Sequence, residues 1–289
     1  MNKKIKKAIL PVAGLGTRFL PITKAQPKEM LPIVDKPILH YLVEEAVNSG
    51  IEEIVIVTGR GKRSIEDYFD YSIELESNLV EKGKEDLLAE VRAIPNLAKI
   101  AYVRQPMPLG DGHAILCAAH LVGDEPIAVL FGDDIIDSEK PALAQMIEVF
   151  EKTGSPVICV EEVPMENISS YGVIDPESNE GDIYKIKGLV EKPNREDAPS
   201  NLGIVGKYIV TPEVLACLRE VERKEGEEIR LIDGFRRYIE KGGSIYGYKF
   251  KGKRYDTGDK WGWIKATIDY TLKREDLGPK LKEYLKDIL

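Results

Sequence analysis

The chain has 289 residues, of which 43% are hydrophobic and 31% charged, a composition typical of a globular protein with a large buried core. Its 41 basic and 49 acidic residues give a net charge of −8, which argues against non-specific binding of nucleic acid but allows a small positive pocket. The three cysteines, Cys117, Cys159 and Cys217, are widely spaced. This spacing argues against a disulfide scaffold or a zinc site and favours a reducing compartment.

The N-terminal segment MNKKIKKAILPVAG has lysines before an apolar run, as a secretory signal peptide does. Pro11 interrupts the run and Arg18 closes it, and its alternating side chains favour a β-strand instead. No apolar stretch in the sequence approaches the roughly 18 residues that a membrane-spanning helix needs. We therefore expect a cytoplasmic protein with no membrane partner.

The first half of the sequence alternates short apolar runs with amphipathic segments. Runs typical of buried strands occupy residues 7–12, 51–59, 99–105, 126–134 and 156–163. Apolar side chains recur at helical spacing in residues 38–48, 110–121 and 138–153, the last with Ser138 as a candidate N-cap. This alternation predicts a three-layer α/β/α, Rossmann-like fold with helices on both faces of the sheet.

The second half of the sequence is more mixed. Apolar runs at residues 171–177, 183–193 and 201–210 follow one another without long helices, so part of the sheet should be antiparallel. Helices are predicted at residues 212–225 and 232–241, and a strand at 244–250. We predict an α/β protein with a mixed, mainly parallel central sheet. It should form a single domain over residues 1–289, with residues 261–289 as a C-terminal helical extension.

Ligands of open α/β sheets bind beyond the carboxyl ends of the strands. Three segments of this sequence fall at such ends: the glycine turn after Val12, the QPMPLGDG loop from Gln105, and Gly132–Asp134. Because these ends meet at one edge of a sheet, we expect the three segments to form one site.

The glycine turn predicts a site for an anion. Gly14 and Gly16 let the backbone approach a ligand and offer N–H groups, although a G-x-G turn alone is equally consistent with a simple tight turn. Arg18 can form a bidentate contact with two phosphate oxygens and Lys28 adds a point charge, so together they favour a phosphate ligand. Three prolines favour an extended, wrapping loop over a helix in this segment: Pro21, Pro27 and Pro32.

The segment AGLGTRFLPITKAQPKEMLP, residues 13–32, resembles the signature of the nucleotide-sugar pyrophosphorylases, in which G-x-G-T-R precedes a spaced P-K. These enzymes join a nucleoside triphosphate to a sugar 1-phosphate and release pyrophosphate. The sequence P-K-E-M-L-P is most similar to that of bacterial members that use UTP and glucose 1-phosphate, whereas members that make dTDP-glucose more often have K-Q-L-L-P. The resemblance covers nearly the whole chain and continues, in order, through RQPMPLGDGHAILCA, GDEPIAVLFGDD, YGVID, GLVEKP, SNLGIVGKYI and KRYDTGD.

The resemblance implies a nucleotide site at four matched positions. Ala13 and Gly14 would contact the uracil and ribose through the backbone. Gln105 would hydrogen-bond the edge of the uracil, and Gly110 would pack under the base.

The resemblance also implies how the phosphates and the sugar are held. Arg18 would hold the β- and γ-phosphates that leave as pyrophosphate, and Lys28 would neutralise the phosphates at the reacting centre. Glu191 would accept hydrogen bonds from sugar hydroxyls, Lys192 would bind the 1-phosphate, and Gly172 would leave room for the sugar ring.

A pair of acids supplies the implied Mg²⁺ site, since Mg²⁺ prefers a few carboxylates together with phosphate oxygens and water. The family resemblance pairs Asp133, at the end of a predicted strand, with Asp256 of RYDTGD. Asp134 and Asp137 lie so close to Asp133 in the sequence that either could be matched to the ligand position in its place. An acid at position 134 departs from many uridylyltransferases, and its involvement stays open.

The implied reaction is Mg²⁺-dependent transfer of UMP from UTP to glucose 1-phosphate, giving UDP-glucose and pyrophosphate by direct in-line attack. A phosphate monoester has a second pKa of about 6, so the nucleophile is already ionised and needs no general base. No H-x-H pair occurs among His40, His113 and His120, which argues against a nucleotidylated histidine. Positioning and charge neutralisation then carry the catalysis.

The same residues allow or exclude several alternative functions. The same chemistry with dTTP or another sugar 1-phosphate stays open, because uracil and thymine present the same hydrogen-bonding edge to Gln105. An NAD-binding oxidoreductase is rejected, because a third glycine is missing and Thr58–Arg60 stands where an acid is needed. A non-catalytic nucleotide-sugar sensor is less favoured, because all the charged positions are present: Arg18, Lys28, Asp133, Lys192 and Asp256.

The association state follows from the resemblance and from the tail. The family resemblance and the apolar residues of the C-terminal segments favour a homodimer or homotetramer. No nucleic-acid partner is expected.

Overall fold

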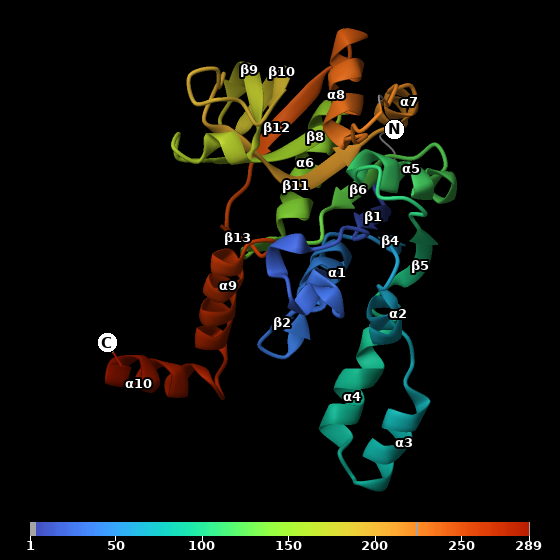
Figure 1. The fold of residues 1–289 in the computed structure, drawn as a ribbon, viewed down its shortest axis with the longest axis vertical. Coiled ribbons are helices and arrows are strands. Elements are labelled where there is room, and N and C mark those ends of the chain that lie inside the picture. The colour runs from blue at the N-terminus through green and yellow to red at the C-terminus, as the bar shows by residue number, and fades with distance from the viewer. Residues whose placement is uncertain (1–3, 224, 289) are drawn as a thin grey trace.

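The computed structural model describes residues 4–223 and 225–288 and has one large sheet at its centre (Figure 1). Within these residues, nine strands form the sheet in the order β5-β4-β1-β6-β11-β8-β12-β10-β9. The strands of the main sheet are β1 (Lys7–Pro11), β4 (Glu53–Thr58), β5 (Lys99–Arg104), β6 (Ile127–Leu130), β8 (Val157–Glu162), β9 (Gly172–Glu180), β10 (Ile183–Glu191), β11 (Leu202–Val210) and β12 (Ile245–Lys249). Two short antiparallel ribbons pair β2 (Pro32–Ile33) with β3 (Lys36–Pro37) and β7 (Asp134–Asp137) with β13 (Lys253–Asp256).

The main sheet is parallel in one half and mixed in the other. β1 is parallel to β4 and to β6, and β4 is parallel to β5. β11 is antiparallel to β6, β8 and β9. Because β11 also pairs with β9, the strands β11, β8, β12, β10 and β9 close into a five-stranded barrel, in which β8 and β12 are parallel.

The predicted α/β class is confirmed, whereas the prediction of a mainly parallel sheet is wrong. Of the nine strand pairings described in the main sheet, five are antiparallel. The physical reason is the length of the connections in the second half. Gly181 and Asp182 alone join β9 to β10, and so short a turn makes antiparallel neighbours, while parallel neighbours need a crossover of a dozen residues or more.

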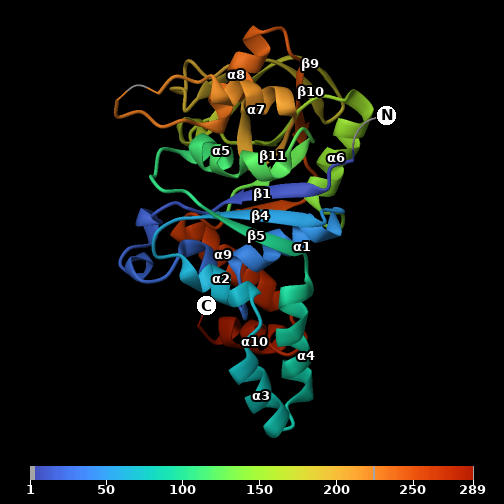
Figure 2. The ribbon, with the colours of Figure 1, turned by 90° about the vertical axis from the view of Figure 1, so that its right-hand side faces the viewer.

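Helices lie on both faces of the sheet, as the edge-on view of Figure 2 shows for α1 and α5. The helices α1, α2 and α6 pack on the face that contains Ala8 and Leu10, and α5, α7 and α8 pack on the face that contains Ile9. Consecutive residues of β1 thus alternate between two apolar layers, as in a strand buried on both sides. These six helices are α1 (Ile38–Asn48), α2 (Arg63–Phe69), α5 (Asp111–Val122), α6 (Ala142–Thr153), α7 (Pro212–Arg219) and α8 (Leu231–Glu240).

Four further helices extend away from the sheet (Figure 1). α3 (Ile73–Glu81) and α4 (Glu85–Ala93) form a hairpin, and α9 (Lys260–Lys273) and α10 (Gly278–Ile288) form the C-terminal part. α9 is anchored to the body, since Trp263 Nε1 donates a hydrogen bond to the carbonyl oxygen of Pro32 over 3.2 Å. Residue 289 of the predicted extension lies outside the described residues. None of the helices in the described part of the chain is long and apolar enough to cross a membrane.

Some predicted element ends differ from the structure. Ser138 does not cap α6, because its hydroxyl donates to the carbonyl oxygen of Lys140 and the helix begins after Pro141. α7 ends at Arg219, well before the predicted end at residue 225. The proline-rich segment after the glycine turn is a loop, as predicted, with three single 3₁₀ turns: Thr17–Phe19, Ile22–Lys24 and Lys28–Met30.

A fully buried lysine connects the elements beneath the carboxyl end of the sheet. Lys207 of β11 donates to Glu45 Oε2 over 2.7 Å and to the carbonyl oxygen of Asp134 over 2.8 Å. Glu45 Oε1 accepts a hydrogen bond from the backbone N–H of Leu143 over 3.1 Å. The Lys207–Glu45 pair therefore links β11, α1, α6 and β7.

Removing one partner of a buried ion pair leaves the other charge without compensation. We expect Lys207→Met to lower the free energy of unfolding by about 3–5 kcal/mol, measured by urea denaturation at pH 7. The double variant Lys207→Met/Glu45→Gln should recover part of that loss, because no charge then remains buried alone. A single variant as stable as the parent chain would contradict this role.

Candidate active site

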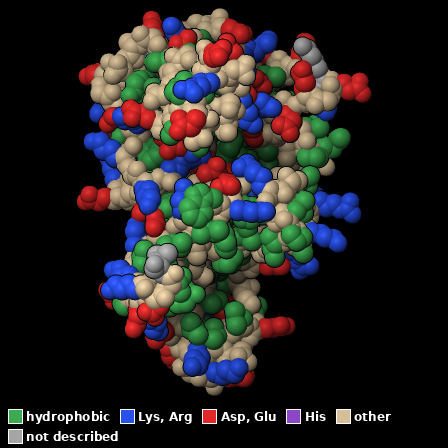
Figure 3. Space-filling model, turned by 60° about the vertical axis from the view of Figure 1, so that its left-hand side comes forward, with side chains coloured by type: hydrophobic (Ala, Val, Ile, Leu, Met, Phe, Trp, Pro, Cys, Tyr) green, Lys and Arg blue, Asp and Glu red, His purple; other side chains and the backbone are tan. Residues whose placement is uncertain are grey.

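Two neighbouring cavities open at the carboxyl end of the parallel strands. The turn cavity, of about 370 Å³, lies beside the glycine turn and is lined by four predicted nucleotide positions, Ala13, Gly14, Gln105 and Gly110. The ribbon cavity, of about 290 Å³, lies beside the β7–β13 ribbon and the barrel. Figure 3 shows a hollow across the middle of one face of the molecule, with acidic and basic side chains around it.

The ribbon cavity brings together predicted residues from distant parts of the chain. Of the predicted site residues, Lys28 lines neither cavity, but its ammonium lies 2.5 Å from Asp133 Oδ2. The predicted residues that line the ribbon cavity are Arg18, Asp133, Gly172, Glu191, Lys192 and Asp256. The nucleotide positions and the sugar-phosphate positions thus fall in two adjoining cavities.

The glycine turn is folded against the loop that contains Lys28. Gly16 has a φ of +65°, a conformation that favours glycine, and a Cβ there would meet Thr23 Cγ2 at 3.1 Å and Lys28 Cβ at 3.3 Å. The Thr23 hydroxyl donates to the carbonyl oxygen of Gly16 over 2.8 Å. Glycine at position 16 thus lets the turn pack closely against Thr23 and Lys28, and the Thr23 hydrogen bond ties the turn to the loop.

A buried ion pair lies directly behind Lys28. Glu29 is 1% exposed and accepts a hydrogen bond from Lys62 Nζ over 2.7 Å. Burial raises the pKa of the Glu29 carboxyl and lowers the pKa of the Lys62 amine. Burial also lowers the pKa of Lys28, but the carboxylates of Asp133 and Glu29 outweigh it and leave that pKa above its ordinary value. Lys28 is therefore a charged group aimed at Asp133.

Asp133 and Asp256 converge although they lie far apart in the sequence. The backbone N–H and the hydroxyl of Thr257 each donate to the carbonyl oxygen of Asp133 over 2.8 Å. A Cβ on Gly258 would lie 2.5 Å from Asp133 Oδ2 and 3.1 Å from Asp256 Oδ1. The two carboxylates thus share a space that only glycine at position 258 leaves open.

The electrostatics of this pair fit a divalent cation. Burial raises the pKa of Asp133, but Lys28 and Arg18 outweigh that effect and hold the pKa below its usual value. Burial and the carboxylate of Asp134 raise the pKa of Asp256, whose ion-pair partner Arg254 is 4.0 Å away. Asp256 is thus the carboxylate whose charge is less fully compensated. A pair of neighbouring carboxylates suits Mg²⁺, which takes its other ligands from phosphate and water. No cluster of three or more potential metal-binding side chains occurs in residues 4–223 and 225–288.

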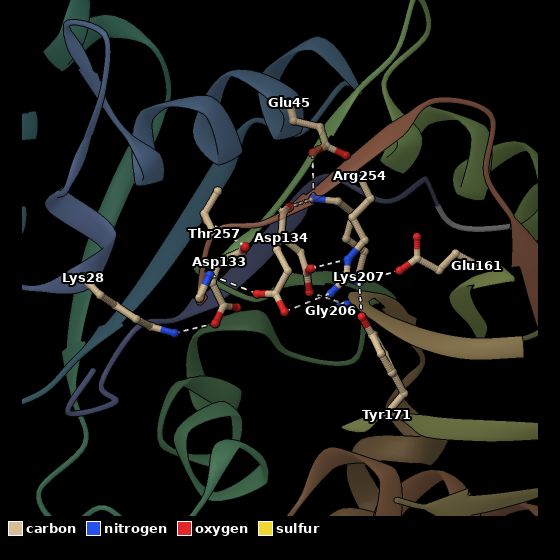
Figure 4. Close-up of polar contacts among 12 residues, drawn as sticks. Lys28, Glu45, Asp133, Asp134, Glu161, Tyr171, Gly206, Lys207, Arg254 and Thr257 are labelled. Carbon is tan, nitrogen blue, oxygen red and sulfur yellow. Dashed lines mark hydrogen bonds and ion pairs between the residues drawn. The ribbon is translucent and has the colours of Figure 1, made fainter. Parts of the chain in front are cut away.

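Arg254 holds the adjacent acids in place (Figure 4). Its Nε donates to Asp134 Oδ1 over 2.5 Å, and its Nη1 pairs with Glu161 and donates to the hydroxyl of Tyr171 over 3.4 Å. The other oxygen of Asp134 accepts a hydrogen bond from the backbone N–H of Gly206 over 2.8 Å. Both carboxylate oxygens of Asp134 are therefore engaged by the protein itself.

Asp137 also has a partner outside the site. Its carboxylate pairs with the ammonium of Lys273 on α9, and it does not line the ribbon cavity. Asp133 and Asp134 both line the ribbon cavity with Asp256, but Arg254 and Gly206 engage the two oxygens of Asp134. Of the three acids that the sequence leaves in competition, Asp133 is therefore the one we assign with Asp256 to the metal.

Gln105 presents a hydrogen-bond acceptor to the turn cavity. Its Nε2 donates to the carbonyl oxygen of Gly110 over 2.9 Å and lies 3.0 Å from Nδ1 of His113. Burial lowers the pKa of His113, so its neutral ring can accept at Nδ1. With both amide hydrogens used in this way, Oε1 is left as the acceptor of the Gln105 amide, and an acceptor suits an N–H donor such as N3–H of uracil or thymine.

Lys192 sits in a strained turn at the sugar-phosphate end. Its φ is +46°, in the left-handed region that non-glycine residues rarely adopt, and its backbone N–H donates to the carbonyl oxygen of Tyr171 over 3.0 Å. The preceding Glu191 pairs with Arg230 over 3.1 Å. A Cβ on Gly172 would lie 3.0 Å from Glu191 Oε2, so a larger residue at position 172 would displace the Glu191 carboxylate.

Two residues that line the ribbon cavity, Arg254 and Arg230, are not among the predicted site residues. A signal for Arg254 was present, since residues two apart in a strand lie on the same side and Arg254 stands two residues before Asp256. Arg230 precedes a predicted helix, and nothing in its surroundings indicates a site.

A glycine turn beside one cavity, with paired acids and basic side chains around the next, defines a transferase that acts on nucleotide phosphates. The chain belongs to the nucleotidyl transferase family, whose model matches residues 7–273. It is 52% identical over 287 residues to the UTP–glucose-1-phosphate uridylyltransferase of Bacillus subtilis (strain 168), covering 99% of this chain and 98% of that protein.

Solved structures show the same similarity. The crystal structure of a UDP-glucose pyrophosphorylase complexed with UDP-glucose has a TM-score of 0.85 and 47% identity, covering 93% of this chain and 100% of that one. The UTP-bound UGPase from Acinetobacter baumannii has a TM-score of 0.91 and 41% identity, covering 99% of this chain and 100% of that one.

The strain at Lys192 can be measured separately from its charge. Lys192→Ala and Lys192→Gly both remove the ammonium, but only glycine adopts a φ of +46° without strain. We therefore expect Lys192→Gly to be more stable than Lys192→Ala by about 1 kcal/mol in urea denaturation, after allowing for the entropy of glycine. Equal stabilities, or a more stable alanine variant, would show that this turn stores no strain.

Proposed function

We propose that the protein transfers UMP from UTP to glucose 1-phosphate in a Mg²⁺-dependent reaction that gives UDP-glucose and pyrophosphate. The observation that supports this most strongly is the convergence of Asp133 and Asp256 where a nucleotide-type cavity adjoins a cavity containing Glu191 and Lys192. The 52% identity to a UTP–glucose-1-phosphate uridylyltransferase over nearly the full length supports the same substrates.

In this proposal the nucleotide occupies the turn cavity. The backbone at Ala13 and Gly14 contacts the uridine, and Gln105 Oε1 accepts a hydrogen bond from the uracil N3–H. Gly110 packs under the base. A side chain is excluded at this position, because the φ is +106° and a Cβ would stand only 2.3 Å from the carbonyl oxygen of Ile229. Thymine offers the same N3–H, so dTTP is the alternative nucleotide to test.

The sugar phosphate occupies the ribbon cavity. Lys192 binds the 1-phosphate, Glu191 accepts hydrogen bonds from sugar hydroxyls, and Gly172 makes room for the ring. Arg18 lines the same cavity and holds the phosphates that leave as pyrophosphate. Placed in this way, the cations lie between two anionic substrates that would otherwise repel each other.

Bound Mg²⁺ would be held by Asp133 and Asp256 and would neutralise charge on the nucleotide phosphates. Lys28, already paired with Asp133, adds positive charge at the same place. A phosphate oxygen of glucose 1-phosphate attacks the α-phosphorus of UTP, and the bond from that phosphorus to the β-phosphate oxygen breaks. Since the attacking oxygen is already ionised, the protein needs to position the two substrates and neutralise their phosphate charge, and it does not need to remove a proton.

We also propose that the protein works in the cytoplasm as a homodimer or homotetramer, folded as a single domain with residues 261–289 as a helical extension. Three free cysteines fit a reducing compartment. Exposed apolar side chains on α9 and α10 supply a surface for a second subunit: Trp261, Ile264, Tyr284 and Ile288.

The proposed activity is tested by pyrophosphate release from the purified protein with Mg²⁺. We expect the highest kcat/KM with UTP and glucose 1-phosphate in a panel that crosses four nucleoside triphosphates with glucose, galactose and mannose 1-phosphates. EDTA should abolish turnover, and added Mg²⁺ should restore it. Absence of pyrophosphate release with every pair would remove the enzymatic proposal and favour a nucleotide-sugar sensor.

The metal assignment is tested with neutral isosteres of the two acids. Asp133→Asn and Asp256→Asn should each lower kcat by roughly 10²–10³-fold, because a ligand for the charge-neutralising ion is lost. Asp137→Asn is the matched control on the same ribbon, and it should retain parental kcat because Asp137 pairs with Lys273 outside the cavity. Near-parental turnover in either isostere would mean that its residue is not a ligand.

A further inference from the structure

Asp111 occupies the boundary between the two cavities. Of the residues that line the turn cavity and those that line the ribbon cavity, Asp111 is the one shared by both. A nucleotide sugar that spans the two cavities must therefore pass this side chain. The sequence motif LGDGHA contains Asp111, but neither the glycine turn nor the acidic pair explains why an acid stands there.

One oxygen of the Asp111 carboxylate has a structural partner. The turn before α5 and the segment before α8 are joined by two backbone hydrogen bonds, from Ile229 N–H to the Leu109 carbonyl over 2.8 Å and from Gly112 N–H to the Ile229 carbonyl over 2.9 Å. Asp111 Oδ1 completes the set by accepting a hydrogen bond from the backbone N–H of Leu231 over 2.7 Å. This contact fixes the orientation of the carboxylate.

The other oxygen has no such partner. Within residues 4–223 and 225–288, Asp111 Oδ2 accepts no hydrogen bond and the carboxylate has no ion pair within 4.0 Å. Burial raises the pKa of Asp111 to about 6, and the nearby carboxylate of Glu228 acts in the same direction. At neutral pH the group is thus a largely ionised, partly buried carboxylate whose Oδ2 is open to a hydrogen-bond donor from a ligand.

The chemistry of that donor follows from the surrounding charges. A phosphate would be repelled by a carboxylate, and the basic groups proposed to hold phosphate are Arg18, Lys28 and Lys192. The part of a nucleotide sugar that carries neutral donors is its hydroxyl groups, which occur on both the hexose and the ribose. A hydroxyl that donates to a carboxylate forms a charge-assisted hydrogen bond, which is stronger than one between neutral groups.

We propose that Asp111 is a specificity-determining residue whose Oδ2 accepts a hydrogen bond from one hydroxyl of the nucleotide-sugar ligand, on its hexose or its ribose. This inference rests on the proposed function, since it requires a ligand that spans both cavities. It assigns to Asp111 a role in substrate choice that is separate from the anchoring of α5, because anchoring uses Oδ1 alone.

The test removes the two halves of the hydrogen bond in turn. On the substrate side, kcat/KM is measured with 2-, 3-, 4- and 6-deoxyglucose 1-phosphates and with 2′-deoxy- and 3′-deoxy-UTP. On the protein side, Asp111→Asn keeps an oxygen for Leu231 N–H but replaces the negatively charged acceptor by a neutral amide. Asp111→Leu removes both interactions, and Glu228→Gln removes a neighbouring charge of the turn cavity as a control.

We expect the parent chain to discriminate by roughly tenfold to a hundredfold against the deoxy substrate that lacks the hydroxyl bound to Asp111. That discrimination should fall at least severalfold in Asp111→Asn and disappear in Asp111→Leu, whereas Glu228→Gln should keep it. The deoxy substrate whose discrimination falls in Asp111→Asn identifies the hexose or the ribose as the source of the hydroxyl, since discrimination that arises at Glu191 should persist. Thermal unfolding shows whether each variant is folded. If Asp111→Leu does not fold, the loss of discrimination in Asp111→Asn alone tests the inference.

Two results would overturn the inference while leaving the proposed function intact. One is a parent chain that uses every deoxy substrate as well as the natural one. The other is an Asp111→Asn variant that slows all substrates by the same factor, which indicates a structural role only. A parent chain with no turnover on UTP and glucose 1-phosphate would overturn the proposed function, and the inference with it.

Discussion

The β7–β13 ribbon is the constraint on which the site depends, because it brings two carboxylates from opposite halves of the chain to one point. In its antiparallel register Asp256 lies opposite Asp134, so the residue before β7 and the last residue of β13 become neighbours. Thr257 then closes the contact with two hydrogen bonds to the backbone of Asp133. A shift of one residue in this register would turn one of the two carboxylates away from the cavity.

Holding acids together costs free energy, and the structure offsets that cost with basic residues placed behind them. Lys28 pairs with Asp133, Arg254 pairs with Asp134 and Glu161, and Lys207 reaches the Asp134 backbone from below. Because these partners come from different elements, the acidic edge is also a junction of the fold. Fixed positive charge of this kind suits a reaction in which two phosphate compounds must approach each other, since preorganised groups need no rearrangement as charge develops.

The sequence predicted the parts of the site that local patterns determine. The parallel strands of the first half place the glycine turn, the loop from Gln105 and Asp133 at one edge, because the carboxyl ends of parallel strands coincide. The family resemblance supplied the pairing with Asp256. Local patterns do not determine strand order, so neither the closure of the barrel by β9 and β11 nor the ribbon that positions Asp256 was predicted.

Charged runs were equally ambiguous before the structure. In GDDIID three acids compete, and only their partners separate them: Arg254 and Gly206 engage Asp134, and Lys273 engages Asp137. Burial of Lys207 could not be predicted either, because a lysine in an apolar strand has no neighbour in sequence that indicates its ion pair. Asp111 reads as an ordinary helix-start acid until the two cavities are seen to meet at it.

In the proposed reaction one divalent ion, held by Asp133 and Asp256, would lie between a nucleotide and a sugar phosphate. Crystals grown with Mn²⁺ and a non-hydrolysable UTP analogue test it directly, since anomalous scattering locates manganese independently of the protein. We expect a manganese peak in contact with both carboxylates and with phosphate oxygen, and the base beside Gln105. Manganese bound away from this pair, or a base seated against Glu191, would contradict it.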